Sequence, residues 1–205
     1  MYMYLIILFS IISYLLGSFS TAFWLGKWFR NIDIRQVGNK NAGATNAYGH
    51  LGAKIGISVF ILDIMKAFIA VQLIYFVPDI AIDTEFYFQI KILFGICAMV
   101  GHIYPIYSGF KGGKGVASMF GIFLGLTPFV GLIVLAFFII LVLLTRIVSI
   151  SSLCSAIAYP IVIYISDYSK SITLTIFSVL ICLLIIITHR ANIKSLAKGE
   201  FRKLF

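Results

Sequence analysis

The chain has 205 residues, of which 61% are hydrophobic and only 11% are charged. A soluble protein carries about 25% charged residues, because its surface faces water. The composition therefore excludes a cytosolic enzyme, a secreted disulfide scaffold and a disordered chain, and it indicates lipid as the main solvent. The net charge of +9 is taken to mark cytoplasmic loops and an anionic partner, rather than nucleic acid.

Seven apolar segments predict an all-α, multi-pass membrane protein that forms one domain over residues 1–205. A spanning helix needs about 20 mostly apolar residues. The segments lie near residues 2–26, 51–77, 86–104, 116–126, 129–145, 151–166 and 171–188. The first segment has small residues at spacings of three and four, namely Ser10, Ser13, Gly17 and Ser20. Such a stripe is typical of helices that pack closely in lipid. No basic stretch precedes this segment, so we expect a retained helix rather than a cleaved signal.

The fourth segment, residues 116–126, is short and is followed by Pro128. One kinked helix over residues 116–145 is the alternative, because proline is tolerated in membrane helices. Two separate segments place Lys111 and Arg146 on the same side of the membrane, as the positive-inside rule prefers. We therefore predict two segments. With about seven transmembrane helices, most basic residues fall on one side of the membrane, which is therefore taken as cytoplasmic. This orientation puts the N-terminus outside and the C-terminus in the cytoplasm.

The first polar cluster, residues 33–46, is rich in glycine and asparagine and cannot continue an apolar helix. These residue types favour a tight turn that directs backbone N–H groups and side-chain amides inward. A plain solvated turn is the alternative.

The second polar cluster contains the run Phe-Lys-Gly-Gly-Lys-Gly, which ends at Gly115. Glycines with lysines can wrap backbone N–H groups around a phosphate while an ammonium supplies the charge. The positive end of a helix that begins at Val116 would face the same anion. The run is not a Walker A loop, because Ser108 and Gly115 replace its first glycine and its Mg²⁺-binding hydroxyl. A flexible glycine loop is the alternative.

Two further clusters lie in the last third of the chain. Ser149 and Ser151 follow Arg146, and such hydroxyls often only cap a helix or bond across helices. His189 and Asn192 are three residues apart and therefore share a helix face. A lone interfacial histidine is more often structural than catalytic.

Two charged residues, Asp63 and Lys66, lie inside the second apolar segment. Charges at that depth are costly, so we expect them to pair and to face the helix bundle. The sequence contains no catalytic carboxylate pair, no metal-binding cluster and no nucleophile elbow, and we expect neither a metal nor another cofactor.

Four motifs occur in one order: residues 38–46, Gly-His-x-x-Pro with the glycine-lysine run, Arg-x-x-Ser-x-Ser-Ser, and His-Arg-x-Asn. Over residues 5–205 the chain resembles the bacterial acyl-phosphate:glycerol-3-phosphate acyltransferase family (PlsY type). The resemblance implies a seven-helix enzyme of the bacterial cell membrane with its active site on the cytoplasmic face. It also implies transfer of a fatty acyl group from acyl phosphate to the 1-hydroxyl of sn-glycerol 3-phosphate. The products are lysophosphatidic acid and phosphate, in the first acylation of phospholipid synthesis.

The resemblance also implies roles for individual residues. The candidate catalytic residues are Lys114, Ser149, His189 and Asn192. The candidate substrate-binding residues are Asn39, Lys40, Asn41, Thr45, Asn46, Lys111, Gly112, Gly113, Gly115, Arg146 and Ser151. The family is thought to use the phosphate of the substrate as the base, and His189 is the alternative base. The first motif departs from the family pattern Gly-Ser-Gly-Asn, because Asn39 and Lys40 replace the serine and the second glycine.

A transporter and an inactive interaction subunit are the alternatives to this function. A transporter of phosphorylated anions would need polar residues across the bilayer and often an inverted repeat. The non-cytoplasmic halves of the predicted helices are mostly apolar, which disfavours that function. An inactive interaction subunit is a third option. No histidine is followed by aspartate five residues later, so the His-x4-Asp signature of coenzyme A-dependent acyltransferases is absent. The expected partners are acyl phosphate, glycerol 3-phosphate and the bilayer, with a monomer among the possible states.

Overall fold

The computed structural model describes residues 2–200, 203 and 204, which form α-helices joined by short 3₁₀ turns and loops. The chain divides into two compact units, Met1–Leu126 and Thr127–Phe205. Among the described residues, four helical segments are long and apolar enough to span a membrane, namely Ala53–Phe76, Glu85–Ser108, Pro128–Thr145 and Val148–Ile165. Two bent helix pairs raise this number to six if each pair forms one span. The prediction of an all-α, multi-pass membrane protein is thus confirmed.

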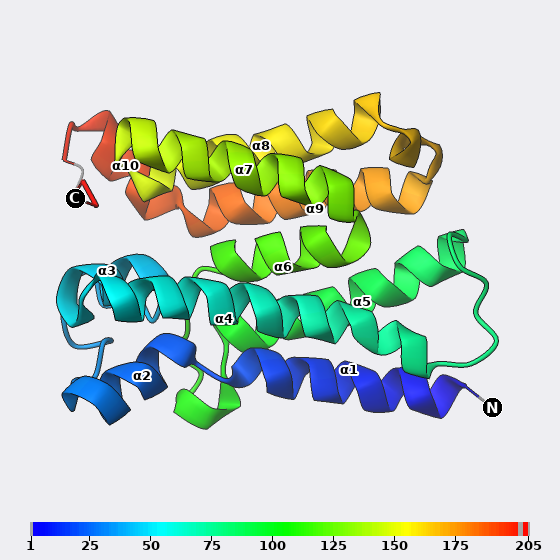
Figure 1. Ribbon diagram of the computed structural model, residues 1–205, viewed down its shortest axis with the longest axis horizontal. Coiled ribbons are helices and arrows are strands. Elements are labelled where there is room, and N and C mark those ends of the chain that lie inside the picture. Colours follow the sequence, from blue (N-terminus) through cyan, green and yellow to red (C-terminus); the bar gives the residue numbers. More distant parts are fainter. Residues whose placement is uncertain (1, 201–202, 205) are drawn as a thin grey trace. The chain divides into compact units, whose positions relative to one another are not determined.

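The first unit contains α1 (Met3–Ser18), α2 (Thr21–Arg30), α3 (Ala44–Leu51), α4 (Ala53–Gln72), α5 (Glu85–Ile103) and α6 (Val116–Leu126). Two 3₁₀ turns, Leu73–Phe76 and Ile106–Ser108, follow α4 and α5. Within this unit α4 contacts all the other helices, and α1 also packs along α5 (Figure 1). The loops that follow α2 and α5 carry the first two polar clusters of the sequence.

Close packing of α1 against α5 depends on one glycine from each helix. A Cβ atom at Gly17 would lie 2.0 Å from the carbonyl oxygen of Ala98, and one at Gly101 would lie 2.2 Å from that of Tyr14. Any side chain at either position would force the two backbones apart. The small-residue stripe of the first segment therefore packs a helix pair, as predicted.

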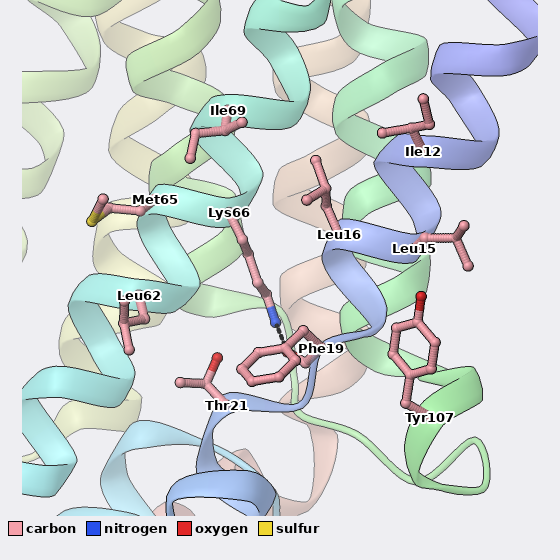
Figure 2. A pocket seen from close by; sticks show the side chains of 10 residues that line it. All are labelled: Ile12, Leu15, Leu16, Phe19, Thr21, Leu62, Met65, Lys66, Ile69 and Tyr107. Carbon is pink, nitrogen blue, oxygen red and sulfur yellow. Dashed lines mark hydrogen bonds between the residues drawn. The ribbon is translucent and has the colours of Figure 1, made fainter.

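The first segment is not one continuous helix, and the prediction of a single helix over residues 2–26 is wrong. The structure ends α1 at Ser18 and begins α2 at Thr21, with a bend of 41° between them. The Phe19 carbonyl at the break accepts a hydrogen bond of 2.8 Å from the Lys66 ammonium of α4. Figure 2 shows this side chain extending from α4 toward the break. Because the partner lies far along the chain, the local apolar pattern could not reveal the break.

The second unit contains α7 (Pro128–Thr145), α8 (Val148–Ile165), α9 (Ile172–Thr188) and α10 (Arg190–Ala197), with a 3₁₀ turn at Asp167–Lys170. Contacts join α8 to both α7 and α9. Leu143 and Leu144 of α7 are 62% and 75% exposed, as expected of side chains that face lipid. Helix α10, which the sequence analysis did not predict, is bent by 60° from α9.

The short fourth segment ends where it was predicted to end. Helix α6 stops at Leu126, and α7 begins with Pro128 in its first turn. Proline suits this position, because the first N–H groups of a helix have no intrahelical partner. Residues 116–145 are therefore two helices rather than one kinked helix. At 11 residues, α6 is about half as long as a helix that spans a bilayer of ordinary thickness.

Candidate active site

The loop after α2 is organised around the side chain of Asn46, which is only 3% exposed. The residue pattern predicted one turn through this residue, but Thr45 and Asn46 lie in the first turn of α3. The Asn46 amide nitrogen donates to three backbone carbonyls, at 2.9, 3.0 and 3.1 Å, namely those of Ile34, Val37 and Asn41. Its side-chain oxygen accepts from the Asn39 N–H at 3.3 Å. Asn46 therefore holds the loop together from inside, whereas Thr45 is exposed.

The two residues that depart from the family pattern form the tip of this loop. The Asn39 side-chain oxygen accepts from the Asn41 N–H at 3.0 Å, which closes an Asx turn. Lys40 has a φ of 60°, in the left-handed region that favours glycine. The backbone thus keeps the conformation that suits the glycine of the family pattern, although a lysine occupies it. Both side chains are exposed.

An arginine that the sequence analysis did not select, Arg35, joins the first loop to the second. Its guanidinium makes two hydrogen bonds to the Asp33 carboxylate, at 2.9 and 2.8 Å, and donates to the Ser108 carbonyl at 2.5 Å. The group also lies 4.2 Å from the centre of the Phe23 ring. The neighbouring guanidinium lowers the pKa of Asp33, mainly through the side-chain hydrogen bond. The Asp-x-Arg spacing was the available signal for this residue.

A polar cavity of about 530 Å³ opens beside this arginine. Residues from α2, from the loop after α2 and from the loop after α5 line it, namely Phe23, Asp33, Arg35, Gln36, Tyr107, Ser108, Gly109 and Lys111. The exposed Lys111 adds a cation whose charge has no acidic neighbour among the lining residues except Asp33. Because Asp33 is already bound to Arg35, the cavity favours an anion.

The glycine run after α5 does not use all its N–H groups as the sequence analysis expected. The Gly112 N–H donates to the Ile103 carbonyl and the Gly113 N–H to the His102 carbonyl, each at 3.1 Å. These two N–H groups therefore fold the run back onto the end of α5, and the expectation that they wrap a phosphate is wrong. A Cβ atom at Gly113 would lie 3.1 Å from the Ala42 carbonyl oxygen, so this run passes close to the first loop.

Lys114 follows these glycines and lies two residues before α6. Its side chain is only partly exposed, and burial lowers the pKa of its ammonium. Gly115, with a φ of +85°, turns the chain between the lysine and the helix. The ammonium therefore belongs to a short segment fixed at one end by α5 and at the other by α6.

The second unit brings together two of the predicted catalytic residues. The Asn192 amide of α10 donates to the Ser149 hydroxyl of α8 at 2.5 Å. His189, 3% exposed, lies where α9 meets α10, and its Nδ1 donates to the Ile185 carbonyl at 2.9 Å. Because a carbonyl can only accept, a neutral His189 ring carries its hydrogen on Nδ1 and has its acceptor lone pair on Nε2.

The other two candidates of the second unit have different surroundings. The hydroxyl of Ser151 is fully buried and donates to the Ile147 carbonyl at 3.1 Å. Arg146 ends α7 in the left-handed conformation, with a φ of 60°, and its side chain is exposed. Arg146 can therefore meet a ligand from solvent, whereas the hydroxyl of Ser151 already bonds within its own helix.

These features define a multi-pass helical membrane protein with cationic loops suited to a phosphorylated substrate. The glycerol-3-phosphate acyltransferase family profile matches residues 7–199, which is nearly the whole chain. The chain therefore belongs to the glycerol-3-phosphate acyltransferase family.

Similar proteins agree with this assignment over almost their full length. A glycerol-3-phosphate acyltransferase of Fusobacterium nucleatum subsp. nucleatum is 36% identical over 195 residues, covering 95% of this chain and 96% of the relative. One of Prochlorococcus marinus is 41% identical over 194 residues, covering 94% of each. The crystal structure of PlsY (YgiH), an integral membrane glycerol 3-phosphate acyltransferase, in its glycerol 3-phosphate form matches with a TM-score of 0.85 at 33% identity. That match covers 97% of this chain and 94% of the other. Its lysophosphatidic acid form matches with a TM-score of 0.83 at 32% identity.

Proposed function

We propose that this protein transfers a fatty acyl group from acyl phosphate to the 1-hydroxyl of sn-glycerol 3-phosphate. The products are lysophosphatidic acid and inorganic phosphate. Membership of the family and the ligand forms of the similar PlsY structures support the acceptor. The observation that carries the donor assignment is a pair of cavities in the first unit, one apolar and one polar, which share the lining residue Tyr107.

The apolar cavity has a volume of about 490 Å³ and lies between α1 and α4 (Figure 2). Its walls are mostly aliphatic, with Leu16, Leu62 and Ile69 among them. Tyr107, from the turn after α5, lines this cavity and also the polar cavity that holds Arg35 and Lys111. An acyl phosphate has the same division, with an apolar chain joined to a dianionic head. We therefore assign the acyl chain of the donor to the apolar cavity and its phosphate head to the cationic loops.

Within the first unit we assign phosphate contacts to exposed or partly exposed groups. The contact residues are Lys114, Lys111, Asn39, Lys40, Asn41 and Thr45, whereas the buried Gly115 acts by turning the chain between Lys114 and α6. Asn46, Gly112 and Gly113 act on the substrate through the loops that they hold, because their polar groups already bond to the protein. The positive end of α6 adds to the charge of Lys114.

The reaction needs alignment more than a strong base. The 1-hydroxyl oxygen attacks the acyl carbonyl carbon, the carbon–oxygen bond to phosphate breaks, and the hydroxyl proton passes to a phosphate oxygen. Alignment of the two reactants can contribute about 7–11 kcal/mol to lowering the barrier. Lys114 stabilises the charge that develops on the departing phosphate. We assign the orientation of the acceptor to Ser149, Asn192 and Arg146, whereas the buried Ser151 acts only through the helix to which its hydroxyl bonds. His189 is the alternative proton acceptor.

We further propose that the chain resides in the bacterial inner membrane with about seven transmembrane helices. The N-terminus lies outside, and the polar clusters face the cytoplasm. The excess of basic residues in the loops after α2, α5 and α7 supports this orientation. Labelling of single cysteines introduced at positions 110 and 146, which are both exposed, tests it. Both are expected to react from the cytoplasmic side, and labelling from opposite sides would contradict the orientation.

An assay of the purified protein in lipid tests the function directly. Palmitoyl phosphate and glycerol 3-phosphate are supplied, and released phosphate and lysophosphatidic acid are measured together. Equal amounts of the two products are expected, and no phosphate release above the protein-free background would refute the proposal. Lys114→Ala is expected to abolish turnover, whereas the matched variant Lys54→Ala, which removes an exposed lysine of α4, should retain it. Palmitoyl coenzyme A in place of the acyl phosphate should give no product.

A further inference from the structure

Four polar side chains are buried together in the first unit where α5 ends. The Asp63 carboxylate of α4 accepts from the Thr21 hydroxyl and from the Lys66 ammonium, each at 2.8 Å. The Nδ1 atom of His102 on α5 lies 3.6 Å from the same carboxylate oxygen. None of the four residues is more than 8% exposed. The group therefore lies in the apolar interior, where charges are costly.

The opposite charges of Lys66 and Asp63 compensate each other. Lys66 satisfies the Phe19 carbonyl at the break between α1 and α2, and Asp63 neutralises the lysine. His102 is not needed for that balance, because the carboxylate and the ammonium already form a pair. The ion pair therefore does not explain why an imidazole is buried beside it. The contacts on the opposite side of the His102 ring do.

The other side of the His102 ring touches the glycine run. A Cβ atom at Gly113 would lie 2.2 Å from Nε2 and 2.9 Å from Cε1 of that ring. The Gly113 N–H also donates to the His102 carbonyl. The residue thus contacts Gly113 through both its backbone and its side chain, and Lys114 is the next residue along the chain. Any shift of the ring would move the segment that carries the ammonium.

We propose that Asp63 and His102 form a positioning pair for the phosphate-binding ammonium of Lys114. Asp63 sets the orientation of the His102 ring, the ring sets the position of Gly113, and Gly113 sets that of Lys114. Neither residue touches the substrate. The inference rests on the proposed function only in assigning a phosphate to Lys114, and it makes the end of α5 part of the binding site.

Steady-state kinetics of His102→Ala and Gly113→Ala test whether His102 positions Lys114 through Gly113. Each variant should raise the KM of one of the two phosphate-bearing substrates at least tenfold and leave the KM of the other within twofold. Gly113→Ala places a methyl group against the ring without altering the buried ion pair, so it remains informative if His102→Ala does not fold. His102→Gln, which keeps a polar side chain of similar length, should fall between the wild type and His102→Ala.

The double variant His102→Ala/Gly113→Ala tests the contact itself. Removal of the ring makes room for the added methyl group, so the double variant should have a lower KM than Gly113→Ala alone. Recovery should be partial, because the Ala42 carbonyl also lies 3.1 Å from that methyl position. Independent, additive losses in the double variant would overturn the proposed contact.

Lys91→Met is the matched control, because Lys91 is another buried cation of α5 and bonds to Tyr87 instead. Lys91 lies 11 residues before His102 on the same helix, which corresponds to about 16 Å along the helix axis. This variant should change thermal stability but neither KM. If the His102 variants likewise change only stability, the positioning role is refuted. If the wild type has no turnover, the donor assignment fails. In that case the wild type and the His102 variants are compared by their equilibrium binding of glycerol 3-phosphate and of inorganic phosphate. Unchanged affinities for both ligands would overturn the inference.

Discussion

The Arg35 guanidinium donates to the Ser108 carbonyl oxygen at 2.5 Å, which joins the loop after α2 to the turn after α5. Asp33 holds the same guanidinium through two further hydrogen bonds. The two polar loops of the first unit are therefore tied together through one guanidinium group.

Arg35→Lys should loosen both loops, because an ammonium cannot reproduce the planar fork that binds Asp33 and Ser108 together. We expect the KM for a phosphate-bearing substrate to rise roughly tenfold, or ~1.4 kcal/mol, with a lower melting temperature in detergent. The pKa of Asp33 is lowered in the fold, so its contribution to stability is full above the pKa of an unfolded aspartate. This contribution is lost as the pH falls through the folded pKa. The stability difference between variant and wild type should therefore shrink in acid. Arg30→Lys, at an exposed position of α2, is the control.

Asn46→Ala should destabilise the first unit, because it leaves the loop carbonyls without their common donor. The expected loss is about 1–3 kcal/mol, as for other buried polar groups that lose a partner. Thr45→Ala, one residue earlier on the same helix, removes an exposed hydroxyl and should leave the unfolding temperature unchanged. Equal melting temperatures for the two variants would contradict the structural role of Asn46.

Substitution of Lys40 separates backbone strain from charge. Lys40→Gly and Lys40→Ala both remove the ammonium, but only glycine adopts the left-handed conformation without cost. The glycine variant should be more stable than the alanine variant by ~1 kcal/mol. Both variants should show the same increase in KM if Lys40 contacts the phosphate. Different KM values would indicate that loop conformation, rather than charge, governs binding.

The pH dependence of turnover should report Lys114. Burial lowers the pKa of this ammonium, and only the protonated form attracts phosphate. The rate should therefore decline on the alkaline side at a lower pH than an ordinary lysine would give. Lys114→Arg keeps its charge at every accessible pH, so that variant should lose this alkaline decline even where its maximal rate is reduced. An unchanged alkaline limb would assign the titration to another group.

Ser149 and Asn192 should behave as one unit in a double-mutant cycle. Their hydrogen bond of 2.5 Å links α8 to α10. Each alanine variant should lower kcat about tenfold, and the double variant should lose little more than the worse single variant. A multiplicative loss would mean that the two side chains act separately. Ser152→Ala, which removes a hydroxyl that donates within its own helix to Val148, is the matched control.

Long-range features of the fold were beyond the local sequence patterns. Apolar runs correctly predicted α4 to α9 and the division at Pro128, because hydrophobicity and proline act locally. The break after Ser18 was missed, since its stabilising partner Lys66 belongs to another helix. Helix α3 was missed because its glycines and asparagine also suit a turn, and the buried contacts of Asn46 decide between the two.

The sequence did not reveal how each polar group of the candidate site is used. Asparagines and glycines were selected as substrate-binding residues, yet Asn46, Gly112 and Gly113 direct their polar groups to the protein's own backbone. Composition does not show whether an amide faces a ligand or a carbonyl. The predicted pairing of Asp63 with Lys66 was confirmed, because two opposite charges in an apolar helix have few other stable arrangements.

The bond from Lys66 to the Phe19 carbonyl also bears on how the protein enters the membrane during synthesis. The nascent α1–α2 segment is made before α4 exists, and a broken helix in lipid cannot leave a carbonyl without a donor. The first segment must therefore stay straight, or keep water at the break, until the ribosome has added Lys66. Its final bend is a late event that depends on the insertion of a neighbouring helix.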